Sequence, residues 1–194
     1  MSLGKQAKVL SKQQQDAVLA FLQTTRHAQR NKVIFLLSVR AGLRAKEIAS
    51  LTWDMVCDAS NVISDAIYLQ DVASKGKSGG VIWMNRELRD ALAEYRNSLK
   101  SGQQSGRVIQ VHARAVSAQM VVNLFWNWYH RLGFTGCSSH SGRRTFITIA
   151  AKKISTVGGS IRDVQMLARH SSLQMTQRYI EADVDAQKRV VQLI

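Results

Sequence analysis

Hydrophobic residues along most of the chain follow the spacing of a helix with one buried face. In these stretches apolar side chains recur at intervals of three and four residues. The predicted helices cover residues 11–24, 33–41, 43–51, 87–99, 116–132, 140–154, 161–167 and 185–193. Because the chain has no proline, helix ends are marked by glycines, such as Gly42 and the pair in residues 133–136.

One stretch changes to a pattern typical of strands. Ala66-Ile-Tyr-Leu69 and Val81-Ile-Trp-Met84 flank a polar turn, residues 74–80, that is rich in Gly and Ser. This pattern predicts an antiparallel hairpin with Lys75 and Lys77 in its turn. The predicted fold class is therefore mainly α with a small antiparallel β-sheet (α+β).

The length of 194 residues, of which 45% are hydrophobic, suits one domain with its own core. We expect residues 1–194 to form a single domain. Residues 1–10 are expected to be a flexible N-terminus. Residues 185–194 are expected to form a C-terminal helix, which either folds back in cis or acts as an oligomerisation arm.

Charge indicates the class of partner. Lys and Arg number 27 against 13 Asp and Glu, so the formal net charge is +14. Such an excess favours a polyanion such as nucleic acid over a merely solvated basic surface.

The sequence has no long apolar segment and no clustered cysteines, and this bears on the location of the protein and on the redox state of its thiols. The longest apolar run, Val33–Leu37, is far shorter than a membrane span, and the N-terminus has no apolar signal core. We therefore expect a cytoplasmic, DNA-associated protein with no membrane partner. Cys57 and Cys137 lack a metal-type spacing and are expected to be reduced, with neither a disulfide nor a zinc site.

The stretch Ala168–Asp183 contains a candidate nucleophile. His170 precedes Tyr179 by nine residues, and the segment between them is typical of a short helix with Ser171 and Ser172 as caps. In surroundings rich in Arg, Lys and His a phenol can be stabilised as phenolate, which makes it a usable nucleophile.

Further basic residues supply what the transfer of a phosphodiester needs. Arginine forks hold phosphate oxygens, a lysine on a turn can protonate a leaving oxygen, and histidines donate hydrogen bonds near neutral pH. Each residue alone has an ordinary explanation as a surface or capping group. The candidate catalytic set is Arg44, Lys75, His140, Arg143, His170 and Tyr179.

Spacing groups some of these residues. His140 and Arg143 are three positions apart, so a helix presents both on one face. Glu47, one turn from Arg44, is expected to orient a neighbouring group as an acceptor. The set contains no acidic cluster for Mg²⁺, so we expect no metal and no other cofactor.

Five segments, in order, resemble the signature of the tyrosine recombinases, the phage-integrase family. They are AGLRAKEIASL with Arg44, ASKGKSGG in the hairpin, HSGRR at 140–144, ARHSS at 168–172 and TQRYIEAD with Tyr179. The resemblance spans about residue 30 to residue 185 and implies a topoisomerase IB-like catalytic fold. It also implies that Tyr179 attacks a scissile phosphate, forming a 3′-phosphotyrosine and a free 5′ hydroxyl without ATP or metal.

The resemblance also implies roles for the other residues. Arg44 and Arg143 match the family's phosphate-clamping arginines, and Glu47 matches an acidic position beside the first of them. His140 and His170 match its histidine positions. Lys75 is favoured as the general acid, with Lys77 as the alternative.

Three features depart from the family pattern. The leucine-glycine-histidine box reads Leu167-Ala-Arg-His170, with one extra residue if aligned on Leu167, and Arg169 stands in place of the glycine. Arg144 replaces a frequent histidine. We expect the N-terminal core-binding domain of many relatives to be absent, so that the protein is an isolated catalytic domain or a small enzyme.

The resemblance implies a double-stranded DNA recombination site as partner. It further implies a homotetramer on DNA, a monomer in solution and accessory DNA-bending proteins. The predicted function is site-specific DNA recombination or integration. Two alternatives remain open: a non-catalytic DNA-binding or regulatory module of the same fold, and topoisomerase IB-like DNA relaxation.

Overall fold

The computed structural model describes residues 6–71, 79–111, 114–180, 188 and 190–192. The chain divides into two compact units, residues 1–146 and residues 147–194. That residues 1–194 form a single catalytic domain stays a prediction.

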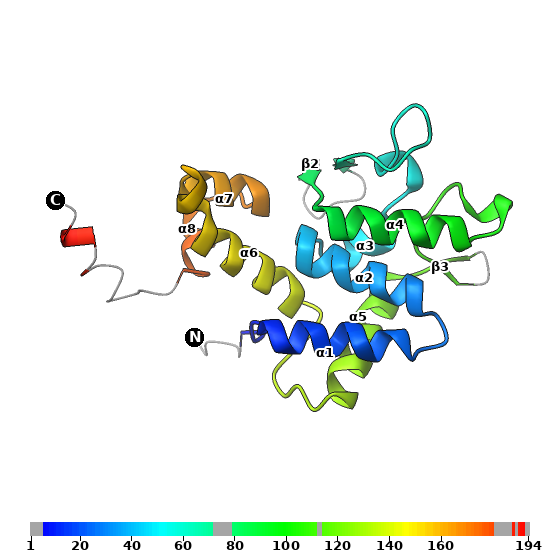
Figure 1. The fold of residues 1–194 in the computed structure, drawn as a ribbon, viewed down its shortest axis with the longest axis horizontal. Coiled ribbons are helices and arrows are strands. Elements are labelled where there is room, and N and C mark those ends of the chain that lie inside the picture. The colour runs from blue at the N-terminus through cyan, green and yellow to red at the C-terminus, as the bar shows by residue number, and fades with distance from the viewer. Residues whose placement is uncertain (1–5, 72–78, 112–113, 181–187, 189, 193–194) are drawn as a thin grey trace. The chain divides into compact units, whose positions relative to one another are not determined.

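The first unit is built mainly from helices. They are α1 (Lys12–Gln23), α2 (Ala28–Ala41), α3 (Ala45–Ser50), α4 (Arg86–Ser98), α5 (Ala118–Arg131) and the start of α6 (Ser141–Lys153). In this unit α2 packs between α1 and α4, and α3 packs against α5 (Figure 1). The helices predicted from hydrophobic spacing are confirmed here, with ends that differ by a few residues.

Helix α2 forms the centre of the core of this unit. Its apolar run Val33–Leu37 is fully buried all round, as expected of a helix surrounded by other elements. The helix begins at Ala28, five residues before the predicted start, because Arg30 and Asn31 are also buried. Arg30 donates two hydrogen bonds to Asn31 Oδ1, and Asn31 in turn donates to Thr25 Oγ1. A hydrophobic pattern does not reveal such a buried polar start.

Gly42 ends α2 as predicted. It has φ 65° and ψ 22°, and its N–H donates to the Leu37 carbonyl. Glycine enters this left-handed region without the steric cost that other residues bear. The chain therefore turns sharply immediately before Arg44 and α3.

Two short antiparallel hairpins complete the first unit. Strands β1 (Ala66–Leu69) and β2 (Gly80–Trp83) pair with Tyr68 opposite Val81, which confirms the predicted strands. Lys75 and Lys77, in the predicted turn, lie outside the described residues. The second pair, β3 (Gln110–Val111) and β4 (Arg114–Ala115), is too short for a sequence pattern and was not predicted. Short 3₁₀ turns occur at Trp53–Met55 (η1) and at Ser101–Gln103 (η3).

The second unit contains the end of α6 and three short elements. They are η4 (Ile154–Val157), α7 (Ile161–Ala168) and α8 (Leu173–Gln177). Helix α7 packs against both η4 and α8. Ser160 begins α7, and its N–H and hydroxyl both donate to Asp163 Oδ2, at 2.7 and 2.8 Å. These bonds lower the pKa of Asp163. Most of the predicted terminal helix at 185–193 lies outside the described residues.

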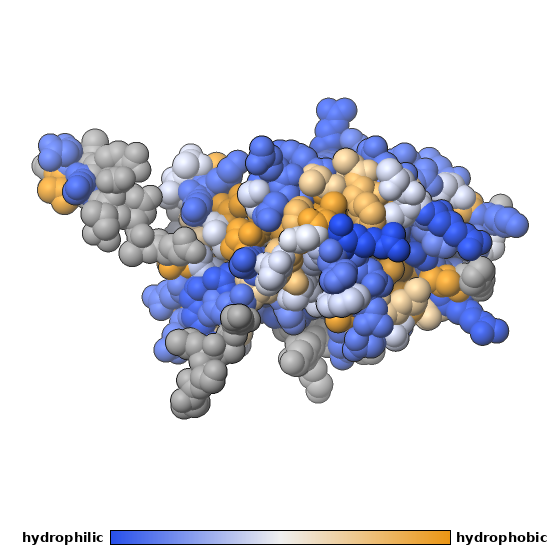
Figure 2. All heavy atoms as spheres, turned by 90° about the horizontal axis from the view of Figure 1, so that it is seen from below, coloured by the Kyte–Doolittle hydropathy of each residue, from blue (hydrophilic) through white to orange (hydrophobic). Residues whose placement is uncertain are grey.

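The surface is mixed. Figure 2 shows hydrophilic side chains over much of one face, interrupted by apolar patches.

Cys57 and Cys137 are free thiols, as predicted, and burial raises the pKa of each. No helix in the described part of the chain has the length and apolar character needed to span a bilayer.

The N-terminal capping box of α1 gives a stability test. Ser11 Oγ accepts from the Gln14 N–H, and Gln14 Oε1 accepts from the Ser11 N–H. Ser11→Ala should lower the free energy of unfolding by about 1 kcal/mol, because a helix-end amide loses its partner. Urea unfolding followed by circular dichroism measures the change. Ser60→Ala, in an exposed turn, is the control, and equal stability of the two variants would contradict the capping role.

Candidate active site

Arg44 is held by a buried carboxylate. Its backbone N–H donates to Glu47 Oε2 at 2.8 Å, and its guanidinium Nη1 donates to Glu47 Oε1 at 2.8 Å. The Glu47 side chain is 0% exposed, whereas that of Arg44 is 23% exposed. A buried carboxylate with two charge-assisted or backbone donors is strongly fixed. Glu47 therefore orients a guanidinium that remains accessible to an anion.

Arg143 is brought to the same short segment. It lies in the first turn of α6, is 5% exposed, and donates from Nη1 to the Gly42 carbonyl at 2.6 Å. Gly42 is two residues before Arg44, although it is 101 positions away from Arg143. The two guanidinium groups anchored to this short segment form the candidate phosphate site, because arginine forks pair with phosphate oxygens.

His140 lies one residue before α6 and is exposed. Its N–H donates to Ser138 Oγ at 3.3 Å, and its carbonyl accepts from the Arg144 N–H at 2.9 Å. His140 and Arg143 thus belong to the same turn, as their spacing predicts, but they differ in burial. Arg143 is held in the interior, while the imidazole of His140 is open to solvent.

In the second unit, His170 and Tyr179 stack. Their ring centroids are 5.5 Å apart with an angle of 28° between the planes. His170 is 7% exposed, and its Nδ1 lies 3.0 Å from Thr176 Oγ1 in a hydrogen bond. Gln165 binds its backbone on both sides, accepting from the His170 N–H and donating to its carbonyl. The half-buried phenol ring therefore rests against a firmly held imidazole.

The short helix predicted between these two residues is α8. Ser172 caps it by accepting from the Met175 N–H, whereas the Ser171 hydroxyl contacts the Met175 sulfur instead. Tyr179 lies in the turn that follows the helix. Because Tyr179 lies on a turn and not in the helix, the conformation of the turn sets where its side chain points.

Arg169 adopts a conformation that non-glycine residues rarely use. It has φ 52° and ψ 47° at the end of α7, and its N–H donates to the Met166 carbonyl. This is the left-handed region that glycine enters readily. This conformation favours an alignment of the leucine-glycine-histidine motif with Ala168-Arg169-His170. In that alignment Arg169 takes the glycine position and no residue is inserted.

The described residues place the candidates in two groups. Arg44, His140 and Arg143 belong to residues 1–146, and the His170–Tyr179 pair belongs to residues 147–194. Lys75 lies outside the described residues. That all six side chains act on one phosphate stays a prediction.

Sequence reasoning missed the contacts that hold these residues. The Gly42 carbonyl, Gln165 and Thr176 were not singled out, because a backbone acceptor, an amide and a helix hydroxyl are ordinary features of any sequence. No metal-type cluster of three or more His, Cys, Asp or Glu side chains occurs within the described part of the chain.

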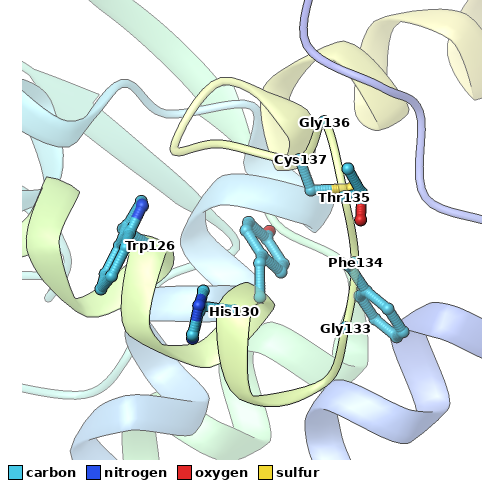
Figure 3. A pocket seen from close by; sticks show the side chains of 8 residues that line it. Trp126, His130, Gly133, Phe134, Thr135, Gly136 and Cys137 are labelled. Atoms are coloured by element: carbon cyan, nitrogen blue, oxygen red, sulfur yellow. The ribbon is translucent and has the colours of Figure 1, made fainter.

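A pocket of about 350 Å³ lies elsewhere in the first unit. It is formed by the end of α5 and residues 133–137 (Figure 3). The rings of Trp126 and His130 stack there at 4.9 Å, and burial raises the pKa of the neighbouring Tyr129. No predicted site residue lines this pocket, so it is distinct from the candidate site.

Comparison with known proteins adds two findings on sequence. The family model for the phage integrase family matches residues 8–185. The tyrosine recombinase XerD of Pseudomonas putida strain KT2440 is 29% identical over 157 residues. That match covers 78% of this chain and 49% of the relative, so the chain spans about half the length of the curated relative.

Solved structures of similar fold have low sequence identity. The Tn1549 transposon integrase in complex with a circular intermediate DNA has a TM-score of 0.75 and 19% identity, covering 99% of this chain and 67% of that one. A lambda integrase dimer bound to a COC′ core site has a TM-score of 0.68 and 16% identity, covering 93% and 63%. These likenesses show the fold, which is the predicted tyrosine recombinase catalytic fold.

Glu47 variants test the anchoring of Arg44. Glu47→Ala should lower the free energy of unfolding by about 3 kcal/mol, because it removes one partner of a largely buried pair. Glu47→Gln should cost about 1–2 kcal/mol, since an amide oxygen can still accept from the Arg44 N–H. Urea unfolding at neutral pH measures both values. Equal losses of stability in the two variants would show that the hydrogen bonds accepted by Glu47 contribute little to the free energy of unfolding.

Arg169 variants test the left-handed end of α7. Arg169→Gly and Arg169→Val both remove the guanidinium, so their difference reports the backbone. The valine variant should be less stable by about 1–2 kcal/mol, because a β-branched residue is disfavoured in this region. Thermal unfolding of the two proteins gives the comparison. A valine variant as stable as the glycine variant would rule out a left-handed backbone here.

Proposed function

The chain belongs to the phage integrase family, and we propose that it is a site-specific tyrosine recombinase or integrase of duplex DNA. The observation that carries the proposal is the hydrogen bond from Arg143 to the Gly42 carbonyl. It anchors a second guanidinium to the segment that carries Arg44 and so supports a phosphate site. The net charge of +14 supports a polyanionic substrate.

In the proposed cleavage step, the Tyr179 hydroxyl oxygen attacks the scissile phosphorus and its proton passes to water. The bond from phosphorus to the 5′ oxygen breaks, and Lys75 protonates that oxygen, with Lys77 as the alternative donor. The products are a 3′-phosphotyrosine and a free 5′ hydroxyl. Since one phosphoester replaces another, the step needs neither ATP nor metal, and attack by a 5′ hydroxyl reverses it.

Arg44 and Arg143 hold the non-bridging oxygens and stabilise the charge of the pentacoordinate phosphorus. Glu47 orients Arg44, in keeping with its buried position and two accepted hydrogen bonds. His170, held by Thr176 and stacked on Tyr179, orients the phenol. His140, which is exposed, donates a hydrogen bond to the phosphate.

The proposed partner is a double-stranded DNA recombination site, as in the DNA complexes of the Tn1549 and lambda integrases. The protein is a monomer in solution, assembles as a homotetramer on this site, and is assisted by DNA-bending proteins. It acts on DNA in the cytoplasm. Residues 185–194 are the oligomerisation arm or fold back in cis.

Covalent trapping tests the proposed chemistry. The substrate is a pool of random-sequence duplexes, each with a nick in one strand. Where cleavage occurs shortly before the nick, the short fragment with the new 5′ hydroxyl diffuses away, so the adduct accumulates and survives denaturant. Tyr179→Phe should reduce adduct by at least about a thousandfold, because no oxygen remains to attack. Its affinity for the same DNA should stay within about twofold, since the ring is kept. Tyr68→Phe, at an exposed tyrosine of β1, is the control and should react as wild type.

Sequencing the trapped DNA identifies the site and separates the alternatives. Adducts confined to one sequence support recombination, whereas relaxation of any supercoiled plasmid favours the topoisomerase IB-like activity. Binding without adduct on every sequence would contradict the enzyme and favour a non-catalytic DNA-binding module.

A further inference from the structure

The first turns of α6 lie very close to α2 at two small residues. Ser38 and Gly142 are both buried. A Cβ added to Gly142 would overlap Ser38 Oγ and lie 2.9 Å from Ser38 Cβ, closer than real Cβ contacts. Within the described part of the chain the Ser38 hydroxyl makes no hydrogen bond. The contact between Ser38 and Gly142 is therefore one of van der Waals packing, which the small size of both residues allows.

A second close contact lies one turn further along each helix. A Cβ added to Gly42 would lie 2.6 Å from Phe146 Cδ1. Gly42 follows Ser38 by four residues, and Phe146 follows Gly142 by four, so the contacts are about 6 Å apart along each axis. Two such contacts set the separation between α2 and the first turns of α6, residues 141–146.

The same part of α6 is held from another side. The Leu10 N–H donates to Thr145 Oγ1 at 2.8 Å, and Thr145 Oγ1 donates to the Ser141 carbonyl at 2.8 Å. Because α6 is tied to the segment before α1, a wedge at Gly142 cannot be relieved by simply rolling the helix away. The strain must appear near Arg143, the next residue.

We infer that Ser38 and Gly142 are positioning residues for Arg143. Their contact sets α6 close enough to α2 for the Arg143 guanidinium to reach the Gly42 carbonyl and stay next to Arg44. This inference rests on the proposed function, in which Arg143 binds the scissile phosphate. A displacement of about 1 Å would lengthen the 2.6 Å bond beyond hydrogen-bonding distance, and misplacement of this size can cost about a hundredfold in rate.

The test inserts one methyl group and then removes its obstacle. Gly142→Ala should slow adduct formation on the trapped DNA site about 10- to 100-fold. Its DNA affinity should change by less than about threefold, because most phosphate contacts remain. Ser38→Gly combined with Gly142→Ala should return the rate to within about threefold of Ser38→Gly alone. The two side-chain atoms nearest the methyl group are then removed, and of the three nearest atoms only the backbone carbon of residue 38 remains, at 3.2 Å.

A matched control separates this effect from general effects of alanine. Gly102 has no atom within 4 Å of an added Cβ, so Gly102→Ala should react as wild type. Helix propensity alone predicts that Gly142→Ala stabilises α6, whereas a steric wedge predicts a lower melting temperature. A merely structural contact would lower the melting temperature without changing the rate per folded molecule.

Each outcome decides the inference. Wild-type rate in folded Gly142→Ala, or no rescue by Ser38→Gly, overturns the positioning role while leaving the proposed function intact. Wild-type protein that forms no adduct overturns the proposed function itself. If Gly142→Ala does not fold, the double variant decides: a folded and active protein supports the inference, and an inactive or unfolded one overturns it.

Discussion

The hydrogen bond from Arg143 to the Gly42 carbonyl is the constraint on which the candidate phosphate site depends. The carbonyl is available because α2 ends in a left-handed glycine, and the guanidinium reaches it because α6 passes α2 at small residues. Arg44 follows on the same segment and is fixed by Glu47. The two guanidinium groups are thus anchored to different acceptors, Arg44 to a buried carboxylate and Arg143 to a backbone carbonyl.

The second unit holds its candidate nucleophile in a different way. His170 is fixed through its backbone by Gln165 and through its ring by Thr176. Tyr179 is attached to a turn after a helix of five residues and packs against the imidazole. In the proposed reaction the phenol must approach phosphorus and later be released from it, which suits a candidate nucleophile on a turn.

Hydrophobic spacing was sufficient to predict most helices and the β1–β2 hairpin, because each buries one apolar face. It placed the start of α2 too late, since Arg30 and Asn31 are polar yet buried, and it missed β3 and β4, which have two residues each. The candidate site residues came from charge chemistry and family resemblance. The Gly42 carbonyl and the contact of Ser38 with Gly142 had no sequence signal, because backbone acceptors and close approach depend on the folded geometry.

A structure of the protein on its DNA site, with vanadate in place of the scissile phosphate, tests directly whether both arginines bind the same phosphate. We expect guanidinium nitrogens of both Arg44 and Arg143 within about 3 Å of vanadate oxygens, with the Tyr179 oxygen bonded to vanadium. A complex in which Tyr179 reaches vanadium while either guanidinium lies more than about 8 Å away, beyond direct contact, would contradict it.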